Sequence, residues 1–594
     1  MALTEQQRDQ QMKQAEELLF KDAHHLGFAK GLYFGYFNQD LIFPYPEMSA
    51  EEQKRCDETV AAVQAFADKH IDAFKIDRDC EIAPDVIKGL GDLGVLGMTV
   101  PEVYGGKGFS QYAYCKMLEV IGAADAGVGI FVNAHHSIGL RAFLLEGTEE
   151  QKARYLPTLA RGEKIAAFGL TEPEAGSDAG NVQTTATLSE DGEHYIINGH
   201  KRYITNAAIA DVMTLMARTQ VPGKDKSEIS SFYIEPKTTT GIEWIHRNQP
   251  KCGVRGTWQA EFKLKDVKVP KANMLGKPGR GLKLALSVLN FGRTTFGATC
   301  TGAAKVCLRA AARHANTRRQ FDQTLGEFEM VKKKLAHMAA DIFAMESTTY
   351  HCASLVDRGF GDYMLETAIL KVFASDCLWR IVNDCIQIYG GKAYFSDEPY
   401  ERMMRDARIN LIGEGANDVM RAFIAMYGMG NVGKSFEAAV SNIFSGTFVR
   451  FVGNRISARL KAPEIQIKNG VLQDEAAMLG RRVKDFGLAV EGMLRKHQKL
   501  ILERQYVQER LADAAIELYT SACVLSRLDS LLSKPMTPAI GRDINVGRFY
   551  IKAASRRIKQ RLAELWDNDD ADTTATADLL LAEYKPSRTN GTHG

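Results

Sequence analysis

The sequence has almost no excess charge of either sign, since 75 basic and 73 acidic side chains leave a formal net charge of +2. Nucleic-acid binding through phosphate contacts requires a basic excess, so we expect no nucleic-acid partner. A run of about 18 apolar residues, the signal of a membrane-spanning helix, is also lacking. The first 20 residues have neither the apolar core of a secretory signal nor the Arg-rich, acid-poor composition of a transit peptide. We therefore expect a cytoplasmic protein, and leave open a processed organellar one or peripheral association with an inner membrane.

Cysteine pairing motifs are absent as well. The ten cysteines are scattered from Cys56 to Cys523 without a CxxC pair or a zinc-like spacing to histidine. His135 and His136 are adjacent, so on a helix they point about 100° apart and are poorly placed to hold one ion. We expect neither a disulfide framework nor a metal site.

The 594 residues exceed the roughly 250–300 at which a single hydrophobic core stops growing, so several domains are expected. The apolar period is helical, then changes to two, then returns to helical. This predicts a mainly α-helical protein with a central β-barrel-like or sandwich domain. The expected units are an N-terminal extension (1–48), an N-terminal helical domain (49–164), a central β-domain (165–270), a helical bundle (271–430) and a C-terminal helical domain (431–594).

Local signals support individual elements. Ser49 and Thr148 each precede two glutamates and are expected to cap helices. The segment 126–145 is apolar nearly all round, which is typical of a buried helix. Asp191-Gly192 lies between β-branched and aromatic flanks and predicts a hairpin turn. The residues after about Asp567 are expected to fray.

A small-residue loop at 169–181, GLTEPEAGSDAGN, begins the β-domain. Taken alone it is as well explained as a helix-to-strand connector. Four further patterns follow in order: NGHKRYITN at 198–206, TRRQF at 317–321, QIYGG at 387–391 and IGEGAND at 412–418. Together the five patterns resemble the acyl-CoA dehydrogenase family. The head, the segment GVGIFVNAHHSIGL and the long helical extension resemble its very-long-chain branch.

The resemblance implies an FAD site with residues from two subunits. Near the flavin it places Phe168, Leu170, Thr171, Gly176, Ser177, Tyr203 and Thr205, with Ser177 also near the substrate. At the adenosine diphosphate end of the partner's FAD it places Arg318, Gln320, Phe321, Gln387, Gly390 and Gly391. A homo-oligomer, most simply a dimer, follows from that sharing. Tyr203 stands where tryptophan is commoner in the family, and Asp322 where glycine is usual.

The resemblance also implies that Glu414 is the catalytic base. A carboxylate opposite the flavin can take the α-proton of a thioester, whereas a glutamate beside glycine can also simply start a helix. Gly415 would let the backbone approach the substrate, and Arg293 would bind the CoA nucleotide through its forked donors. Gly413 replaces a larger family residue, and with 128–130 it is expected to leave a roomy acyl cavity.

The implied function is FAD-dependent α,β-dehydrogenation of long-chain fatty acyl-CoA to trans-2-enoyl-CoA, with an electron-transfer flavoprotein as electron acceptor. An acyl-CoA oxidase, or a respiratory-complex assembly factor with little catalytic role, is the alternative.

Two further segments have competing interpretations. GMGNVGKS at 428–435 matches the phosphate-loop pattern, but the preceding residues predict a helix capped by Gly428, so we favour the helix over an NTPase. The basic, aromatic stretch 436–461 could lie on a membrane surface, although docking on its own protein is the favoured interpretation.

Overall fold

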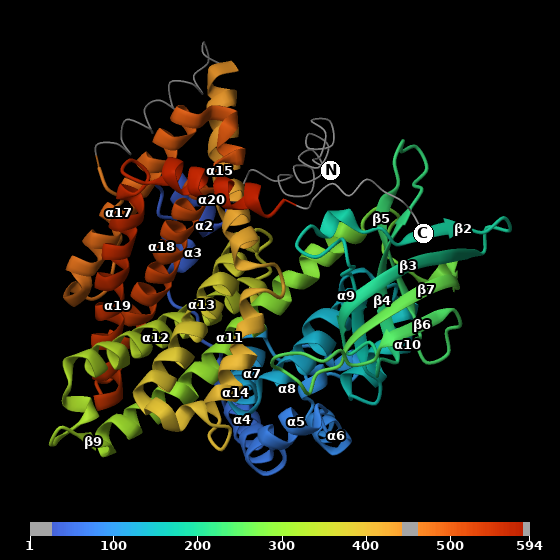
Figure 1. Cartoon of the computed structure of the whole chain (residues 1–594), viewed down its shortest axis with the longest axis horizontal. Helices are drawn as coiled ribbons and strands as arrows, with labels where there is room; N and C mark the ends of the chain where they lie inside the picture. The colour runs from blue at the N-terminus through green and yellow to red at the C-terminus, as the bar shows by residue number, and fades with distance from the viewer. Residues whose placement is uncertain (1–25, 442–460, 586–594) are drawn as a thin grey trace.

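The computed structural model describes residues 26–441 and 461–585. Along them a helical domain, a β-domain, a helical bundle and a C-terminal helical domain follow one another (Figure 1). This confirms the predicted fold class, in which a β-domain lies between helical ones. The element type changes from helix to strand at Ala166 and back to long helices at Gly281.

The first and last helices of the N-terminal helical domain begin with caps that the sequence predicts. The Ser49 hydroxyl accepts a hydrogen bond from the Glu52 N–H, and Thr148 forms a capping box with Gln151. These contacts satisfy N–H groups that have no partner within the first turn of a helix. The helices are α4 (Ala50–His70), α5 (Ala73–Asp79), α6 (Pro84–Asp92), α7 (Gln111–Ala124), α8 (Ala126–Val132), the π-helix η3 (Asn133–Gly139), α9 (Arg141–Glu146) and α10 (Glu149–Ala160).

The apolar segment from Ala126 is helical throughout, but its middle is the π-helix η3 rather than regular α-helix. Its length and composition would suffice for a membrane span, yet 72% of its most apolar window is buried inside the protein. A buried core helix, as predicted, accounts for that composition.

The β-domain is an eight-stranded sheet with the order β6-β7-β3-β2-β4-β5-β8, and β1 pairs in parallel with β4. The predicted hairpin is confirmed, because β2 and β3 are antiparallel with Leu188 opposite Tyr195. Gly192 has a φ of 74° in the turn, which glycine adopts without strain. The strands are β1 (Ala166–Gly169), β2 (Thr185–Leu188), β3 (His194–Thr205), β4 (Val212–Thr219), β5 (Glu228–Ile234), β6 (Ile242–His246), β7 (Gln259–Pro270) and β8 (Met274–Leu275).

Apart from a last helix that projects from the body, the remaining helices share one continuous hydrophobic core. The short helices α2 (Phe28–Tyr33) and α3 (Gln39–Ile42) of the N-terminal extension lie among them (Figure 1). There the Lys30 ammonium pairs with Asp362, and the Tyr33 hydroxyl donates to the Ile424 carbonyl. The long helices are α11 (Gly281–Thr317), α12 (Glu329–Asp357), α13 (Met364–Tyr389), α14 (Tyr400–Arg408), α15 (Asn417–Ser441), α17 (Gln473–His497), α18 (Gln505–Leu532) and α19 (Pro538–Ala563).

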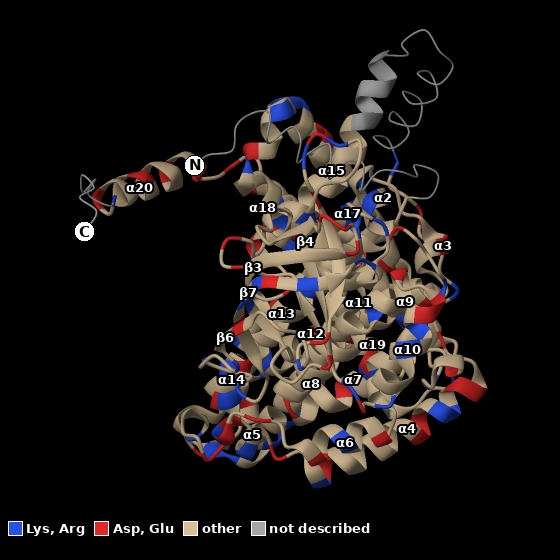
Figure 2. Cartoon of the chain, turned by 90° about the vertical axis from the view of Figure 1, so that its right-hand side faces the viewer, with Lys and Arg blue, Asp and Glu red and all other residues tan. Residues whose placement is uncertain are grey.

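Two sequence expectations about these helices are wrong. Gly428 does not end its helix, because α15 continues to Ser441. A Cβ at Gly428 would lie 2.2 Å from the Tyr33 ring, so this glycine serves close packing and not termination. The residues after Asp567 do not all fray, since Asp570–Glu583 form helix α20, which projects from the body and carries acidic side chains (Figure 2).

Candidate active site

The loop that carries Glu414 connects the 3₁₀ turn η8 (Ile409–Leu411) to α15. Glu414 has a φ of 56° and Gly415 a φ of 97°. The left-handed region costs a non-glycine residue roughly 1–2 kcal/mol, and such backbone strain persists only where the surroundings hold it. The conformation points to a functional constraint on this glutamate, and a helix-start role alone does not require it.

The Glu414 carboxylate lies in a buried, charged environment. Its Oε1 accepts a hydrogen bond from the Asn133 amide at 3.2 Å. Its Oε2 is sealed from solvent and has no hydrogen-bond partner among the described residues. Burial raises the pKa of Glu414, while the positive charges of Arg293 and Lys371 oppose the rise. An unpartnered carboxylate oxygen of raised basicity is suited to take a proton.

Arg293 lies inside the protein, close to this carboxylate. It sits on α11, donates to Asn290 at 3.2 Å and contacts the Met420 sulfur at 3.6 Å. Burial lowers its pKa to about 10, while the Glu414 charge acts in the opposite direction. The Arg293 guanidinium is therefore shielded from open solvent, and its charge acts on the Glu414 carboxylate. Its contact with a CoA nucleotide stays a prediction.

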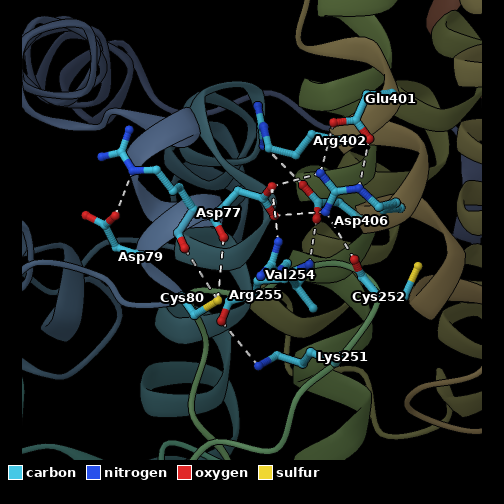
Figure 3. Close-up of polar contacts among 12 residues, drawn as sticks. Asp77, Asp79, Cys80, Lys251, Cys252, Val254, Arg255, Glu401, Arg402 and Asp406 are labelled. Carbon is cyan, nitrogen blue, oxygen red and sulfur yellow. Dashed lines mark hydrogen bonds and ion pairs between the residues drawn. The ribbon is translucent and has the colours of Figure 1, made fainter. Parts of the chain in front are cut away.

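The N-terminal side of the loop is fixed by a polar cluster around α14 (Figure 3). The Arg402 guanidinium donates to Asp125 at the start of α8 and to Asp406 on its own helix. Asp406 in turn accepts the Val254 N–H of the β-domain. Arg405 pairs with Asp77 of α5. The helix that leads to Glu414 is therefore tied to both preceding domains.

The loop 169–181 faces the same site from the β-domain. The Ser177 hydroxyl lies 3.5 Å from the Ala416 N–H, which brings two of the sequence patterns together. Phe168, Leu170, Thr171 and Thr205 are half-buried, and a Cβ on Gly176 would meet nothing within 4 Å. Tyr203 is 54% exposed although it is a large aromatic residue. An open aromatic face beside a small-residue loop fits a flat, ring-shaped cofactor such as a flavin.

The other predicted cofactor residues lie at the far end of α11. Arg318 follows Arg293 by 25 residues, or about 37 Å at 1.5 Å per residue. The hairpin of β9 (Arg319–Gln320) and β10 (Gln323–Thr324) that comes next lies far from the strands of the β-domain (Figure 1). Phe321 there is 88% exposed, and Gly390 and Gly391 leave open space where a Cβ would lie. The Tyr389 ring stacks on His314, so the QIYGG pattern lies beside the end of α11. Arg318, Gln320 and Gln387 are all exposed.

Two residues of the site went unnoticed in the sequence, Asn133 and Lys371. Asn133 contacts the base directly, and the Lys371 ammonium donates to the Gly415 carbonyl and to the Asn417 side chain. Each is a polar residue within an apolar helical stretch, and a buried polar group needs a partner. That rule could have identified Asn133 and Lys371 as residues with a buried polar partner, although it does not identify the partner.

The phosphate-loop pattern does not form a phosphate loop. Residues 428–435 lie within α15, so their backbone N–H groups are used in helical hydrogen bonds and cannot cradle a phosphate. The NTPase interpretation is wrong. The basic stretch 436–461 lies mainly outside the described residues.

Four family models match the chain in order. The acyl-CoA dehydrogenase N-terminal, middle and C-terminal domains match residues 51–163, 167–267 and 279–429, and the ACAD9/ACADV C-terminal domain matches 470–580. The mitochondrial very long-chain specific acyl-CoA dehydrogenase of Mus musculus is 35% identical over 560 residues, covering 91% of this chain and 84% of that protein. The Homo sapiens protein of the same name is 36% identical over 559 residues, with 91% and 85% covered.

Solved structures agree with the sequence relatives. An acyl-CoA dehydrogenase from Bacillus anthracis in complex with FAD superimposes with a TM-score of 0.76 at 28% identity, over 94% of this chain and 95% of the other. Butyryl-CoA dehydrogenase from Megasphaera elsdenii gives a TM-score of 0.60 at 33% identity, over 65% of this chain and 99% of the other.

Proposed function

The chain belongs to the acyl-CoA dehydrogenase family, and from that we propose that Glu414 removes the α-proton of a long-chain fatty acyl-CoA, which becomes the trans-2-enoyl-CoA. FAD-dependent fatty acyl-CoA dehydrogenation, the first step of β-oxidation, is the reaction that the relatives support. The observation that carries the residue assignment is the sealed, unpartnered Oε2 of Glu414. Its loop lies against the Ser177 side of the site that fits a flavin.

The protein groups divide the work. FAD, held by the loop 169–181 and Tyr203, would supply the hydride acceptor. Asn133 donates to Oε1 and so orients the carboxylate, leaving Oε2 for the proton. Arg293 and Lys371 oppose the rise in the pKa of Glu414 that burial causes, and so favour the ionised form that a base requires.

A homodimer is the oligomer that we propose. Arg293, close to the base, and Arg318, in the second group of predicted cofactor residues, are about 37 Å apart along α11, which favours a flavin site shared between two subunits. The exposed Phe321 hairpin end and the open glycines at 390–391 would then serve the flavin of a partner subunit.

Mixed dimers test this sharing. Subunits carrying Glu414→Gln and subunits carrying Arg318→Glu should each be nearly inactive alone. A heterodimer of the two, isolated by two affinity tags, should regain one complete site and about half the activity of a wild-type dimer. That follows because Glu414 of one subunit and Arg318 of the other would both be intact in that site. Absence of any gain in the heterodimer would show that each subunit completes its own flavin site, and a monomeric protein would refute the shared site outright.

An electron-transfer flavoprotein is the proposed electron acceptor, as expected for the family. The second candidate acceptor is oxygen, which would make the protein an acyl-CoA oxidase. Reoxidation of substrate-reduced protein by air and by electron-transfer flavoprotein separates the two. Peripheral membrane association and a cytoplasmic location are proposals that rest on the sequence alone.

The acyl-chain preference gives a direct test of the substrate class. A Cβ at Gly413 would meet only the Ile409 carbonyl oxygen, at 3.6 Å, so a side chain is tolerated at this position beside the base. Each methylene that leaves water contributes up to about 0.8 kcal/mol. We expect bleaching of bound FAD by saturated acyl-CoAs to show kcat/KM rising from short to long chains. Gly413→Phe should move the optimum to shorter chains.

Gly361→Phe is the matched control, because Gly361 also has open space around its Cβ position and lies on the surface. It should leave the chain-length profile unchanged. An optimum at butyryl-CoA would overturn the long-chain assignment, and an optimum unmoved by Gly413→Phe would remove Gly413 from the acyl cavity. A folded protein that cannot be loaded with FAD would overturn the function itself.

A further inference from the structure

Lys371 is a buried ammonium directly behind the Glu414 loop. It lies on α13 with no exposed surface. Its Nζ donates to the Gly415 carbonyl and to the Asn417 Oδ1, each at 2.7 Å. Both acceptors are neutral, and the carboxylates whose charge acts on this ammonium are Glu414, with the larger effect, and Asp376. Burying an ammonium against neutral acceptors costs free energy, so stability alone does not account for its position.

Both acceptors lie just after the base in the chain, where the turn leads into α15. The Gly415 carbonyl immediately follows Glu414, in the stretch where both residues have positive φ. On the other side of the turn, the Gly413 N–H bonds to the Ile409 carbonyl at 2.8 Å. A hydrogen bond from a charged donor is about twice as strong as a neutral one. The Lys371 contact therefore holds the Gly415–Ala416 peptide, which directly follows the two residues of positive φ.

The contact continues into the C-terminal helical domain. The Asn417 amide donates to Asp376 at 2.8 Å, and Asp376 accepts from Arg421 at 2.6 Å. Arg421 also donates to Asp513 of α18 at 2.8 Å, and Arg561 of α19 lies 3.2 Å from the same carboxylate. The charged groups border a cavity of about 200 Å³ between α13, α15, α18 and α19. A continuous polar chain thus links the base loop to the C-terminal helical domain.

We propose that Lys371 is a positioning residue for Glu414, and that the C-terminal domain supports it through the chain Asn417–Asp376–Arg421–Asp513. The inference rests on the proposed function, since it takes Glu414 as the base. Lys371 acts through the loop conformation and does not touch substrate. The C-terminal helices then contribute to catalysis as a support for the strained turn.

Lys371→Met tests the near end of the chain. It keeps a similar volume but removes the donor and the charge. A misplacement of about 1 Å in an active site can cost about 10²-fold in rate, so kcat should fall by about that factor while KM for acyl-CoA changes little. The described ionisable groups that act on Glu414 are Arg293 and Cys300 on α11 and Lys371 on α13. Loss of the Lys371 charge should move the acid limb of the kcat–pH profile to higher pH. Amide hydrogen exchange of a peptide spanning 409–420 should become faster.

Asp513→Asn tests the far end, with Asp341→Asn as its matched control. Asp341 on α12 is a buried acid that pairs with Arg380 at 2.9 Å. Among the described residues it makes no hydrogen bond to Asn417, Asp376, Arg421 or Asp513. Asp513→Asn should lower kcat roughly 3–10-fold and speed exchange at 409–420, whereas Asp341→Asn should change neither.

The outcomes distinguish the positioning role of Lys371 from the proposed role of Glu414 as the base. If Lys371→Met keeps kcat within about threefold and leaves exchange at 409–420 unchanged while Glu414→Gln is inactive, the positioning role is overturned and the base stands. If Lys371→Met does not fold, the comparison of Asp513→Asn with Asp341→Asn tests the proposal. Equal effects of these two variants on kcat and on exchange at 409–420 overturn the role of the C-terminal domain. If Glu414→Gln retains wild-type activity, the proposed function itself fails.

Discussion

Glu414→Gln should leave the fold and the FAD content unchanged and lower kcat by at least about 10²–10⁴-fold, the usual contribution of a general base. Glutamine has nearly the same shape and can keep a hydrogen bond to Asn133. It cannot accept the α-proton at the position of Oε2. Stopped-flow reduction of bound flavin by acyl-CoA measures the step directly, and the visible spectrum of the purified variant reports its flavin content.

The pH dependence follows from the same carboxylate. The base acts only when deprotonated, so the wild-type rate should rise with pH through the pKa of Glu414. Burial raises that pKa, and Arg293 and Lys371 oppose the rise, so the limb should lie above about 4.3, the ordinary value for glutamate. The limb should vanish in Glu414→Gln.

Asp418→Asn is the matched control for charge removal. Asp418 is an exposed acid four residues away, in the first turn of α15. Its replacement should leave kcat and the acid limb in place. Wild-type turnover by Glu414→Gln would mean that another group takes the proton, and an equal loss in Asp418→Asn would point to a general effect of charge.

The features predicted correctly from sequence are those that short-range physics determines. The caps at Ser49 and Thr148 need only a side-chain oxygen next to free N–H groups. The β2–β3 hairpin needs only alternation around a turn that contains glycine. The unusual Asp322, noted where glycine is common, has a φ of 63°, and aspartate is among the few other residues that tolerate this region.

The features that sequence reasoning missed depend on long-range contacts. Gly428 looks like a helix end in sequence, but its lack of a side chain is used by Tyr33, which lies almost 400 positions earlier in the chain. The partners of Lys371 lie 44 and 46 positions away, and Asn133 reaches Glu414 across 281 positions. Periodicity identifies an element and its buried face, but it does not identify which distant element supplies a partner.

Lys201→Met should destabilise the β-domain by about 3–5 kcal/mol, the usual cost of removing one partner of a buried ion pair. Lys201 on β3 has no exposed surface, and its ammonium lies 2.7 Å from the Glu172 carboxylate. It also donates to the Leu170 and Met216 carbonyls, while Glu172 accepts the Gln183 and Thr184 N–H groups. The pair thus joins the loop 169–181 to β2, β3 and β4.

The double variant Lys201→Met/Glu172→Leu separates pairing from packing. Most of the loss in the single variant comes from the unpaired Glu172, because Lys201 otherwise holds the pKa of that carboxyl low. Replacing both partners with apolar side chains removes the buried charge, so the double variant should be more stable than Lys201→Met. The exposed pair Lys265–Glu243, with both side chains more than half exposed, gives the control, and Lys265→Met should cost less than about 1 kcal/mol. The urea concentration that releases FAD measures each effect, since the loop 169–181 is expected to hold the flavin. A Lys201→Met midpoint equal to that of Lys265→Met would show that the buried pair contributes no more than a surface one.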